Sequence, residues 1–333
     1  MRAALRPTPP TRGLLVAAGA AAVLALSACG GTEQATSAGA ASTTSSDAAG
    51  TSAAPETVVV EHAQGETEVP VDPETVVVFD LGVLSTLDVL DAEVAGVPES
   101  GALAEQMPDY AGATTVGSLF EPDVEAVAAL EPDLIVVAAR SAESLPALEG
   151  IAPTIDLTVD QTDFLASARE RIETLGTIFG EEELVAERLE ALDALAAETS
   201  EAAADAGTGL VVMTSAGEVS AYGPGSRFGL VHSAMGVTPA DEGLSPEASH
   251  GDAVSFEHLA DTDPDHLFVL DRDAAIGQEA TPAAQVLDNP LVAGTTAAQS
   301  DDIHYLDSFA WYVAPAGLGS LETMFTEVRD AVA

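Results

Sequence analysis

The chain contains no lysine, and all ten of its cationic residues are arginines. Against them stand 55 acidic residues, which give the 333-residue chain a formal net charge of −45 at pH 7. A surface this acidic repels nucleic acid and anionic lipid headgroups, so we expect no nucleic-acid partner. Because positive charge is so scarce, any place where arginines gather is informative.

Cysteine and recognisable catalytic motifs are scarce as well. Cys29 is the only cysteine, which excludes internal disulfides and thiol catalysis from the folded body. The chain has no Gly-x-Ser-x-Gly nucleophile elbow and no His-Glu-x-x-His zinc-protease signature. His250, Glu257 and His258 suggest a metal site, but Glu257 and His258 are adjacent and point to different faces of a helix. We therefore predict that the protein is not an enzyme and has no intrinsic cofactor.

The first 56 residues predict an export signal followed by a tether. Residues 1–28 carry three arginines and an apolar stretch of about 15 residues, short for a membrane span and suitable for a signal peptide. They end in Leu-Ser-Ala before Cys29, which resembles the lipobox of bacterial lipoproteins, where the cysteine is acylated. The alternative is a plain secretory signal. Residues 29–56 predict a flexible tether, so we expect a body anchored by lipid to the outer face of the cytoplasmic membrane.

From residue 57 onward, short β-rich runs alternate with helical patterns, which is typical of α/β units. We predict two α/β lobes, at 57–162 and 207–333, joined by a long helical connector at 163–206 that bends at Gly180, with a ligand cleft between the lobes. Strands are expected at 75–79, 134–137, 155–157, 210–214, 219–222, 267–270 and 303–306, and helices at 83–90, 141–148 and 318–332.

One pattern occurs twice, 132 residues apart. "EAVAALEPDLIVVAAR" (125–140) and "EHLADTDPDHLFVLDR" (257–272) place Glu, Pro, Asp and Arg at the same offsets. Each copy is typical of a helix, a Pro-Asp turn, a buried strand and a terminal arginine. We interpret the pair as a structural repeat with one copy in each lobe.

The repeated arginines predict an anion site. Ligands of open α/β sheets bind beyond the carboxyl ends of the strands, which is where Arg140 and Arg272 stand. Arg227 lies in "YGPGSRFG" (222–229), where we expect Ser226 to cap a following helix whose dipole also favours anions. The alternative for each arginine is a salt bridge with one of the many acidic residues.

From about residue 57 to 333 the chain resembles bacterial substrate-binding proteins with a rigid helical connector, which deliver iron–siderophores and vitamin B12 to ABC importers. The likeness is greatest to binders of ferric catecholate siderophores of the enterobactin and petrobactin types. The stretches that carry it are "FDLGVLSTLDVL" (79–90), "GSLFEPDVEAVAALEPDLIVVAARS" (117–141), "SAYGPGSRFG" (220–229), "SHGDAVSFEHL" (249–259), "FVLDRDAAIG" (268–277), "AQVLDNPLV" (284–292) and "YLDSFAWYVAPAGLGSLETM" (305–324).

The resemblance implies a role for each candidate site residue. Arg140, Arg227 and Arg272 match the triad that holds catecholate oxygens, since a ferric tris-catecholate carries about three negative charges and arginine binds anions through a planar fork. Tyr312 and His250 match residues that complete the iron shell when the siderophore supplies only four donors, and Trp311 belongs to the siderophore-binding surface. The alternatives are a locally hydrogen-bonded loop histidine and a tyrosine that packs beside Trp311.

The same resemblance implies partners. Glu125 and Glu257 match glutamates that dock onto arginines of the permease, so we expect an ABC permease with its ATPase, a ferric siderophore as ligand, and a monomeric chain. The alternative for both glutamates is an exposed helix charge without a partner role. The chain departs from the family pattern at Asp252, where Gln is more usual, and this leaves the siderophore open. Other readings are a carrier of haem, B12 or a divalent metal, and a lipoprotein enzyme or adhesin that shares the fold.

Overall fold

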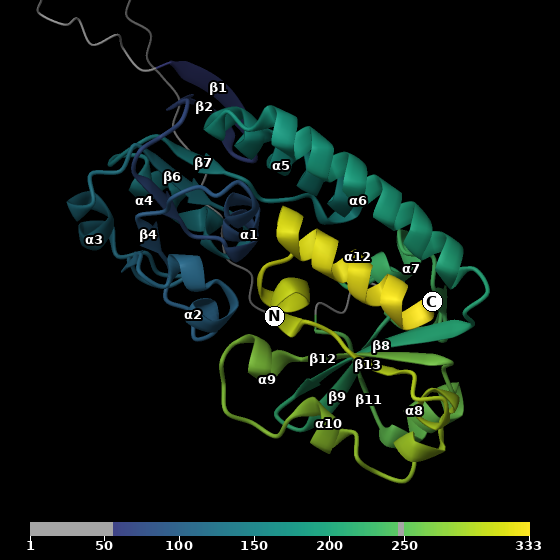
Figure 1. Ribbon diagram of the computed structural model, residues 1–333. Coiled ribbons are helices and arrows are strands. Elements are labelled where there is room, and N and C mark those ends of the chain that lie inside the picture. The colour runs from purple at the N-terminus through teal and green to yellow at the C-terminus, as the bar shows by residue number, and fades with distance from the viewer. Residues whose placement is uncertain (1–55, 246–249) are drawn as a thin grey trace, which may run out of the picture. The chain divides into compact units, whose positions relative to one another are not determined.

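The computed structural model describes residues 56–245 and 250–333, all of which belong to one compact unit. The predicted signal peptide, Cys29 and the tether up to residue 55 lie outside the described residues. Among the residues that are described, no helix has the length and apolar character needed to cross a bilayer. The α/β fold with two lobes and a helical connector is confirmed (Figure 1).

The first lobe is built on a five-stranded parallel sheet in the order β5-β4-β3-β6-β7. The antiparallel hairpin β1–β2 precedes this sheet and was not predicted from the sequence. The elements are β1 (Thr57–His62), β2 (Gly65–Pro70), β3 (Val76–Val78), α1 (Leu81–Val89), β4 (Gly96–Val97), α2 (Leu103–Gln106), η1 (Pro108–Tyr110), β5 (Thr114–Thr115), α3 (Val124–Ala129), β6 (Leu134–Val137), η2 (Ala139–Ser144), α4 (Leu145–Leu148) and β7 (Thr154–Asp156).

The predicted connector forms two helices, α5 (Phe164–Phe179) and α6 (Glu182–Ala203), after the short turn η3 (Gln161–Asp163). Gly180 ends α5 in the left-handed region with φ 69°, which is where a helix commonly stops and which suits glycine. The expected bend therefore lies at the expected residue.

The second lobe is built on a six-stranded mixed sheet in the order β11-β9-β8-β12-β13, with β10 also paired to β8. The pairs β8–β12, β12–β13 and β8–β10 are parallel, whereas β9 and β11 are antiparallel to their neighbours. The elements are β8 (Thr208–Ser215), β9 (Glu218–Tyr222), α7 (Leu230–Ser233), β10 (Thr238–Pro239), β11 (Asp252–Val254), α8 (Phe256–Thr262), β12 (His266–Asp271), α9 (Arg272–Ala275), α10 (Ala283–Val286), η4 (Val292–Gly294), α11 (Thr296–Gln299), β13 (Ile303–Tyr305), η5 (Phe309–Val313) and α12 (Leu318–Val332).

The repeat seen in the sequence has the same local structure in both lobes. Glu131 and Asp263, the residues before the two prolines, are left-handed with φ 50° and 43°. The aspartate that follows each proline accepts hydrogen bonds from the start of the neighbouring parallel strand: Asp133 from Thr75 N at 3.0 Å, and Asp265 from Thr208 N at 2.8 Å. Each copy thus ties together two adjacent strand starts.

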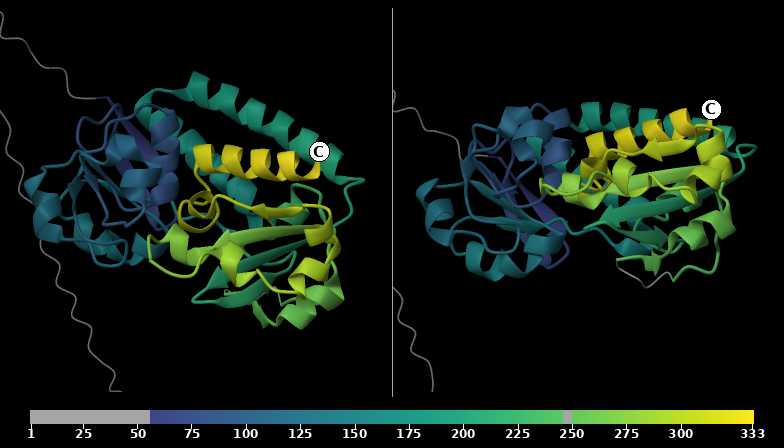
Figure 2. Two further views of the ribbon diagram at one scale, coloured as in Figure 1. Left: turned by 60° about the horizontal axis from the view of Figure 1, so that its bottom comes forward. Right: turned by 90° about the horizontal axis from the view of Figure 1, so that it is seen from below.

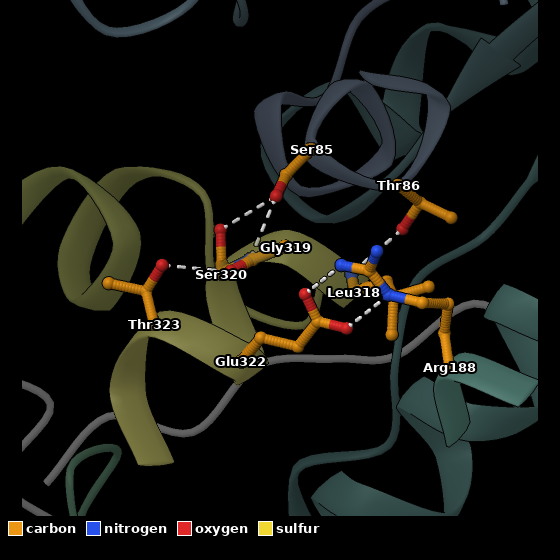
Figure 3. Close-up of polar contacts among 8 residues, drawn as sticks. All are labelled: Ser85, Thr86, Arg188, Leu318, Gly319, Ser320, Glu322 and Thr323. Atoms are coloured by element: carbon orange, nitrogen blue, oxygen red, sulfur yellow. Dashed lines mark hydrogen bonds and ion pairs between the residues drawn. The ribbon is translucent and has the colours of Figure 1, made fainter. Parts of the chain in front are cut away.

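The lobes are joined by α12 as well as by the connector, because α12 contacts both α6 and α1 (Figure 2). Gly317 precedes α12 without offering it a capping side chain. Two hydroxyls on α1 take that role: Thr86 Oγ1 accepts from Leu318 N at 3.0 Å, and Ser85 Oγ accepts from Ser320 N at 2.9 Å (Figure 3). A helix of the first lobe therefore caps the last helix of the second.

This joint is tightly packed. A Cβ atom on Gly82 would lie 2.3 Å from the carbonyl oxygen of Pro315, and one on Gly317 would lie 2.2 Å from the carbonyl oxygen of Gly82. Both backbones approach more closely than any other residue allows. Arg188 of α6 also binds Glu322 of α12 through two hydrogen bonds (Figure 3).

Candidate anion-binding site

Tyr312 lies in η5, a π-helical turn that follows β13. Phe309, Ala310, Trp311 and Val313 are buried in this turn, whereas Tyr312 is half-buried. Four buried neighbours fix the turn to the core, so the phenol and the backbone carbonyl of Tyr312 are held in place. Single π turns of this kind are frequent at functional sites.

Two of the three predicted arginines stand just beyond strand ends. Arg140 lies in η2, three residues after the last residue of β6, and Arg272 follows β12 directly as the first residue of α9. Asp271 caps α9 by accepting from Ala274 N at 3.0 Å, which fixes the direction in which the chain leaves the strand. Both arginines therefore lie where they were predicted, just beyond the carboxyl ends of β6 and β12.

Arg227 lies in the turn that follows β9, and the expectation that it opens a helix is wrong. The Ser226 hydroxyl donates back to the Gly223 carbonyl at 2.7 Å, which closes a turn. The helix α7 begins only at Leu230, after Gly229, and has no side-chain cap. A helix dipole thus adds nothing at Arg227, and its attraction for anions rests on its own charge.

The structure brings the three arginines together around Tyr312. The carbonyl oxygen of Tyr312 accepts from Arg140 Nη2 at 3.1 Å and from Arg227 Nη2 at 3.2 Å. Arg140 Nη1 also donates to the Val313 carbonyl at 3.2 Å, and Arg272 Nε donates to the phenol oxygen of Tyr312 at 3.0 Å. Their guanidinium carbons lie 6.0, 4.6 and 5.7 Å from the centre of the tyrosine ring, in the order Arg140, Arg227, Arg272. Both lobes contribute, since Arg140 belongs to the first.

The positive charge of this cluster is poorly compensated. Within the described parts of the chain, Arg140 and Arg227 form no ion pair, and Arg272 has only the buried Asp273 at 3.7 Å. Most of their polar contacts are to neutral carbonyl and hydroxyl groups. Positive charges that lie this close together, with mainly neutral groups as their hydrogen-bond acceptors, favour the binding of an anion between them.

Arg227 keeps much of its side chain open to solvent, although its guanidinium group packs on two aromatic rings. Burial of that group lowers the pKa of Arg227, Tyr312 raises it, and the nearby charge of Arg140 lowers it. Arginine remains charged at any physiological pH, so the lowered pKa reflects mainly the burial of a charged group and, after that, the nearby charge of Arg140.

Sequence reasoning missed two residues at this site. Asp80 lies just after β3, and Arg140 lies just after β6, the parallel strand beside it. Asp80 also caps α1, because its carboxylate accepts a hydrogen bond from Val83 N at 2.9 Å. Burial raises the pKa of Asp80, while its hydrogen bonds and Arg140 lower it. Ser215 ends β8 beside β12 and accepts from Arg272 Nη1 at 3.5 Å. Both stand at ends of strands next to those that carry arginines, which is the signal that would have found them.

His250 lies on an exposed loop directly before β11, and no contact joins it to the arginines in the part of the chain that is described. The next residue, Gly251, abuts the Tyr222 ring, where a Cβ would lie 2.8 Å from ring atoms. Tyr222 in turn packs edge-on against Phe228, next to Arg227. Asp252, the departure from the family pattern, accepts from Ser245 N at 2.6 Å and so holds this loop.

Trp311 is buried, with 2% of its surface exposed, and its Nε1 donates to Glu327 Oε2 at 2.9 Å. Burial raises the pKa of Glu327, while this bond and one from Asp307 N lower it. The indole therefore packs in the hydrophobic core and helps to hold the η5 turn. Almost none of its surface is accessible to a ligand in this conformation. Its contact with the siderophore stays a prediction.

Glu125 and Glu257 are both exposed, and each is the second residue of its helix, α3 or α8. Neither belongs to the arginine cluster. They hold equivalent places in the two copies of the repeat.

Two cavities lie elsewhere, and neither is lined by Arg140, Arg227 or Arg272. One of about 360 Å³ is lined by acidic groups of the first lobe, among them Asp88, Glu93 and Asp109. The other, of about 520 Å³, lies beside the start of α5 and includes Asp160 and Arg171. An acidic lining does not suit an anion, so the charge, and not the cavity size, identifies the site.

A protein-family model described as "periplasmic binding protein" matches residues 76–310. The petrobactin-binding protein YclQ of Bacillus subtilis is 41% identical over 288 residues, which cover 83% of this chain and 89% of that protein. The ferric-anguibactin-binding protein FatB of Vibrio anguillarum is 29% identical over 81% of this chain and 86% of its own length.

Solved structures agree. The crystal structure of YclQ superposes with a TM-score of 0.78 and 40% identity, covering 83% of this chain and 99% of that one. The periplasmic catecholate-siderophore binding protein VctP of Vibrio cholerae superposes with a TM-score of 0.76 and 33% identity, covering 83% of this chain and 100% of that one.

Proposed function

Because this chain belongs to the periplasmic binding protein family, a family of binding proteins and not of enzymes, we propose that it captures a ferric catecholate-type siderophore and delivers it to an ABC importer. The observation that carries this proposal is the gathering of Arg140, Arg227 and Arg272 on Tyr312. Three of the seven arginines that follow Cys29 meet there, in a chain with 55 acidic residues.

The charge of the ligand fits the charge of the site. Three catecholates bring about six negative charges to Fe(III), which leaves about three on the complex, equal to the three guanidinium charges. A planar fork can bind the catecholate oxygens and can also lie against a catechol ring. Three relatives support this class of ligand, since they are named for binding petrobactin, anguibactin or a catecholate siderophore.

Tyr312 and His250 complete the iron shell when the ligand leaves two coordination positions open. Tyr312 is supported by its place at the centre of the arginine cluster. His250 is supported by its loop, which lies against Tyr222 close to Arg227, and it must turn toward the iron. A phenolate oxygen and an imidazole are suitable ligands for iron.

The body is held outside the cytoplasmic membrane by acylated Cys29, and it meets its permease as a monomer through Glu125 and Glu257. The symmetric, exposed places of these glutamates on α3 and α8 support this docking. A relative that is named a putative ABC transporter substrate-binding lipoprotein, YhfQ of Bacillus subtilis, supports the lipid anchor.

A divalent-metal carrier would bring several histidines and carboxylates together at the ligand site. Among the described residues, the one such group lies at the opposite end of β12 from Arg272. Haem and B12 are not trianions, so a cluster of three poorly compensated arginines favours neither of them. The arginine cluster therefore decides between these functions.

The test is a fluorescence titration of the purified full-length chain, in which Trp311 is the only tryptophan. We expect ferric catecholates with four or six donors to quench its emission with sub-micromolar affinity, because their visible absorption accepts energy from the nearby indole. Ferric hydroxamates, haem and B12 are the comparison ligands. A response to hydroxamates alone, or to none of these ligands, would overturn the proposal.

A further inference from the structure

A second group of metal-ligating side chains lies at the far end of β12 from the arginines. His266 opens β12, whereas Arg272 follows its last residue, so about 20 Å of strand separate the two. Asp302 and His304 belong to the neighbouring strand β13 and the residue before it. The three form the one group of at least three candidate metal ligands found among the described residues.

Strand register places all three side chains on one face of the sheet. Phe268 of β12 pairs with His304 of β13, and Leu267 pairs with Ile303. Because side chains alternate along a strand, His266 and Phe268 share a face, as do Asp302 and His304. The rings confirm this arrangement, since those of His266 and His304 stack with centroids 5.5 Å apart.

One hydrogen bond settles which nitrogen of His266 carries the proton. His266 Nε2 lies 3.0 Å from the carbonyl oxygen of Ala206, which only accepts, so Nε2 bears the hydrogen. Its Nδ1 then presents a lone pair toward His304. A histidine that binds a metal almost always donates its other ring N–H to a carbonyl or carboxylate in this way.

The distances suit a tetrahedral ion. His266 Nδ1 and His304 Nε2 are 3.3 Å apart, and Asp302 Oδ1 lies 3.9 Å from the same His304 nitrogen. Two nitrogens bound to one tetrahedral Zn²⁺ at about 2.0–2.1 Å lie roughly 3.3–3.4 Å apart. All three ligand atoms lie within 4.8 Å of one another, so the half-buried Asp302 has to move inward to complete the third side.

From this geometry we propose that His266, Asp302 and His304 bind a divalent transition metal ion, best matched by Zn²⁺, with a water in the fourth position. Two imidazoles and one carboxylate are a donor set suited to zinc. The ion would link β12 to β13, which is the edge strand of this sheet. Through the hydrogen bond of His266 to Ala206, it would also be connected to the segment that follows α6. This is a structural site, separate from the cargo site.

The alternative is a plain hydrogen bond in which His304 Nε2 donates to His266 Nδ1, with no affinity for metal. The two readings share the 3.3 Å contact between these nitrogens and differ in what lies between them, a proton or a metal ion. Metal binding itself separates the two readings, because a hydrogen-bonded pair with no ion would not select zinc over magnesium.

The experiment uses the full-length chain, Co²⁺ as a spectroscopic probe and Zn²⁺ as competitor, in excess Mg²⁺ to fill sites made only of carboxylates. We expect one equivalent of Co²⁺ to give the intense visible bands of a four-coordinate ion, and Zn²⁺ to displace it. Zn²⁺ should also raise the thermal unfolding midpoint, because an ion that binds only the folded state stabilises it.

His304→Asn should lower zinc affinity more than roughly 100-fold, since even the loss of an outer-shell partner costs about 10–100-fold. Asp302→Asn, at a side chain that is 34% exposed, should weaken binding without unfolding the chain. His62→Gln, at a half-buried histidine of the first lobe, should leave it unchanged. Binding that is equal in the wild-type chain and both site variants, or that Mg²⁺ abolishes, would overturn the proposal. Arg272→Ala should keep full zinc binding, so this result is independent of the siderophore.

Discussion

Arg272 donates from Nε to the phenol oxygen of Tyr312 over 3.0 Å, while the carbonyl of the same tyrosine accepts from Arg140 and Arg227. One residue thus holds all three cations, through its side chain on one side and its backbone on the other. A ligand that draws the guanidinium groups onto its own oxygens also releases the phenol. The proposed iron ligation by Tyr312 would therefore be linked to anion binding by the arginines.

This link predicts a ligand-dependent effect of Tyr312→Phe. With a catecholate siderophore of four donors, the variant should lose the visible charge-transfer band that a phenolate–iron bond produces, and its affinity should fall. With six donors the iron shell is full, so the same change should matter little. Absorption spectra of the two complexes give the measurement.

Tyr305→Phe is the matched control, because Tyr305 is 50% exposed in β13 and makes no contact with the arginines among the described residues. It should leave both complexes as they are in the wild-type chain. Equal losses at Tyr312→Phe with both ligand types would argue that the phenol acts by packing and not by binding iron.

Arg227→Ala tests the charge of the cluster. It removes a guanidinium whose carbon lies 4.6 Å from the Tyr312 ring centre, the shortest of the three distances. Ligand affinity should weaken by about 1.5–3 kcal/mol, the scale of hydrogen bonds to charged groups. Titration of the Trp311 fluorescence gives the measurement.

Arg169→Ala should serve as its control, because Arg169 pairs with Asp193 between the connector helices and is remote in sequence from the site. Its ligand affinity should match that of the wild-type chain. If Arg227→Ala also matched it, Arg227 would not be part of the binding site.

The proposed docking to a permease predicts that binding and transport can be separated. Glu125→Ala and Glu257→Ala, together, should leave siderophore affinity unchanged, because both carboxylates are exposed and lie outside the arginine cluster. Iron uptake by cells that carry the cognate permease should fall sharply. Glu198→Ala, an exposed change on the connector helix α6, is the control and should leave uptake intact. Normal uptake with the double variant would exclude these glutamates from docking.

The sequence predicted those parts of the fold whose signal is local. The apolar run of β6 was bounded correctly at Leu134–Val137, because a Pro-Asp turn precedes it, and α12 was bounded correctly by its helical periodicity. The repeat also predicted a Pro-Asp turn in each lobe, because the signal for such a turn lies within the turn itself. The left-handed residue before each proline was not predicted.

Features with a weak local signal, and features that depend on distant residues, were not predicted. Hairpin β1–β2 has weak alternation, and its strands pair with each other without a strong turn signal. The capping of α12 by Ser85 and Thr86 joins residues more than 230 positions apart. The cluster of His266, Asp302 and His304 depends on strand register, and the hydrogen bond of the buried Trp311 joins it to Glu327 of α12.

The shared cap of α12 predicts a cost for Thr86→Val. Valine has nearly the same shape, but it leaves the buried Leu318 N–H without its acceptor at 3.0 Å. The free energy of unfolding should fall by about 1–3 kcal/mol, the cost of a buried unpaired polar group. Urea denaturation gives the measurement.

Thr323→Val, on α12, is the control for Thr86→Val (Figure 3). The Thr323 hydroxyl donates to the carbonyl of Gly319 within the same helix, so its loss leaves no buried N–H without a partner. The control should cost clearly less. Equal costs would show that the bond between α1 and α12 adds nothing beyond ordinary packing.

The last prediction concerns Asp265, the aspartate of the second repeat. The backbone N–H of Thr208 donates to its carboxylate at 2.8 Å and the Thr208 hydroxyl at 2.9 Å, and the backbone bond is the larger cause that lowers the pKa of Asp265 from its usual 3.8. A carboxyl whose folded pKa is lowered stabilises the native state above the unfolded value and loses this contribution as pH falls through the folded value. Asp265→Asn should therefore destabilise the chain most above about pH 5, and the difference from wild type should shrink below about pH 4. Urea unfolding across this range, with Asp205→Asn at an exposed position as the control, measures it. A difference that stayed constant with pH would mean that the charge of Asp265 does not stabilise the fold.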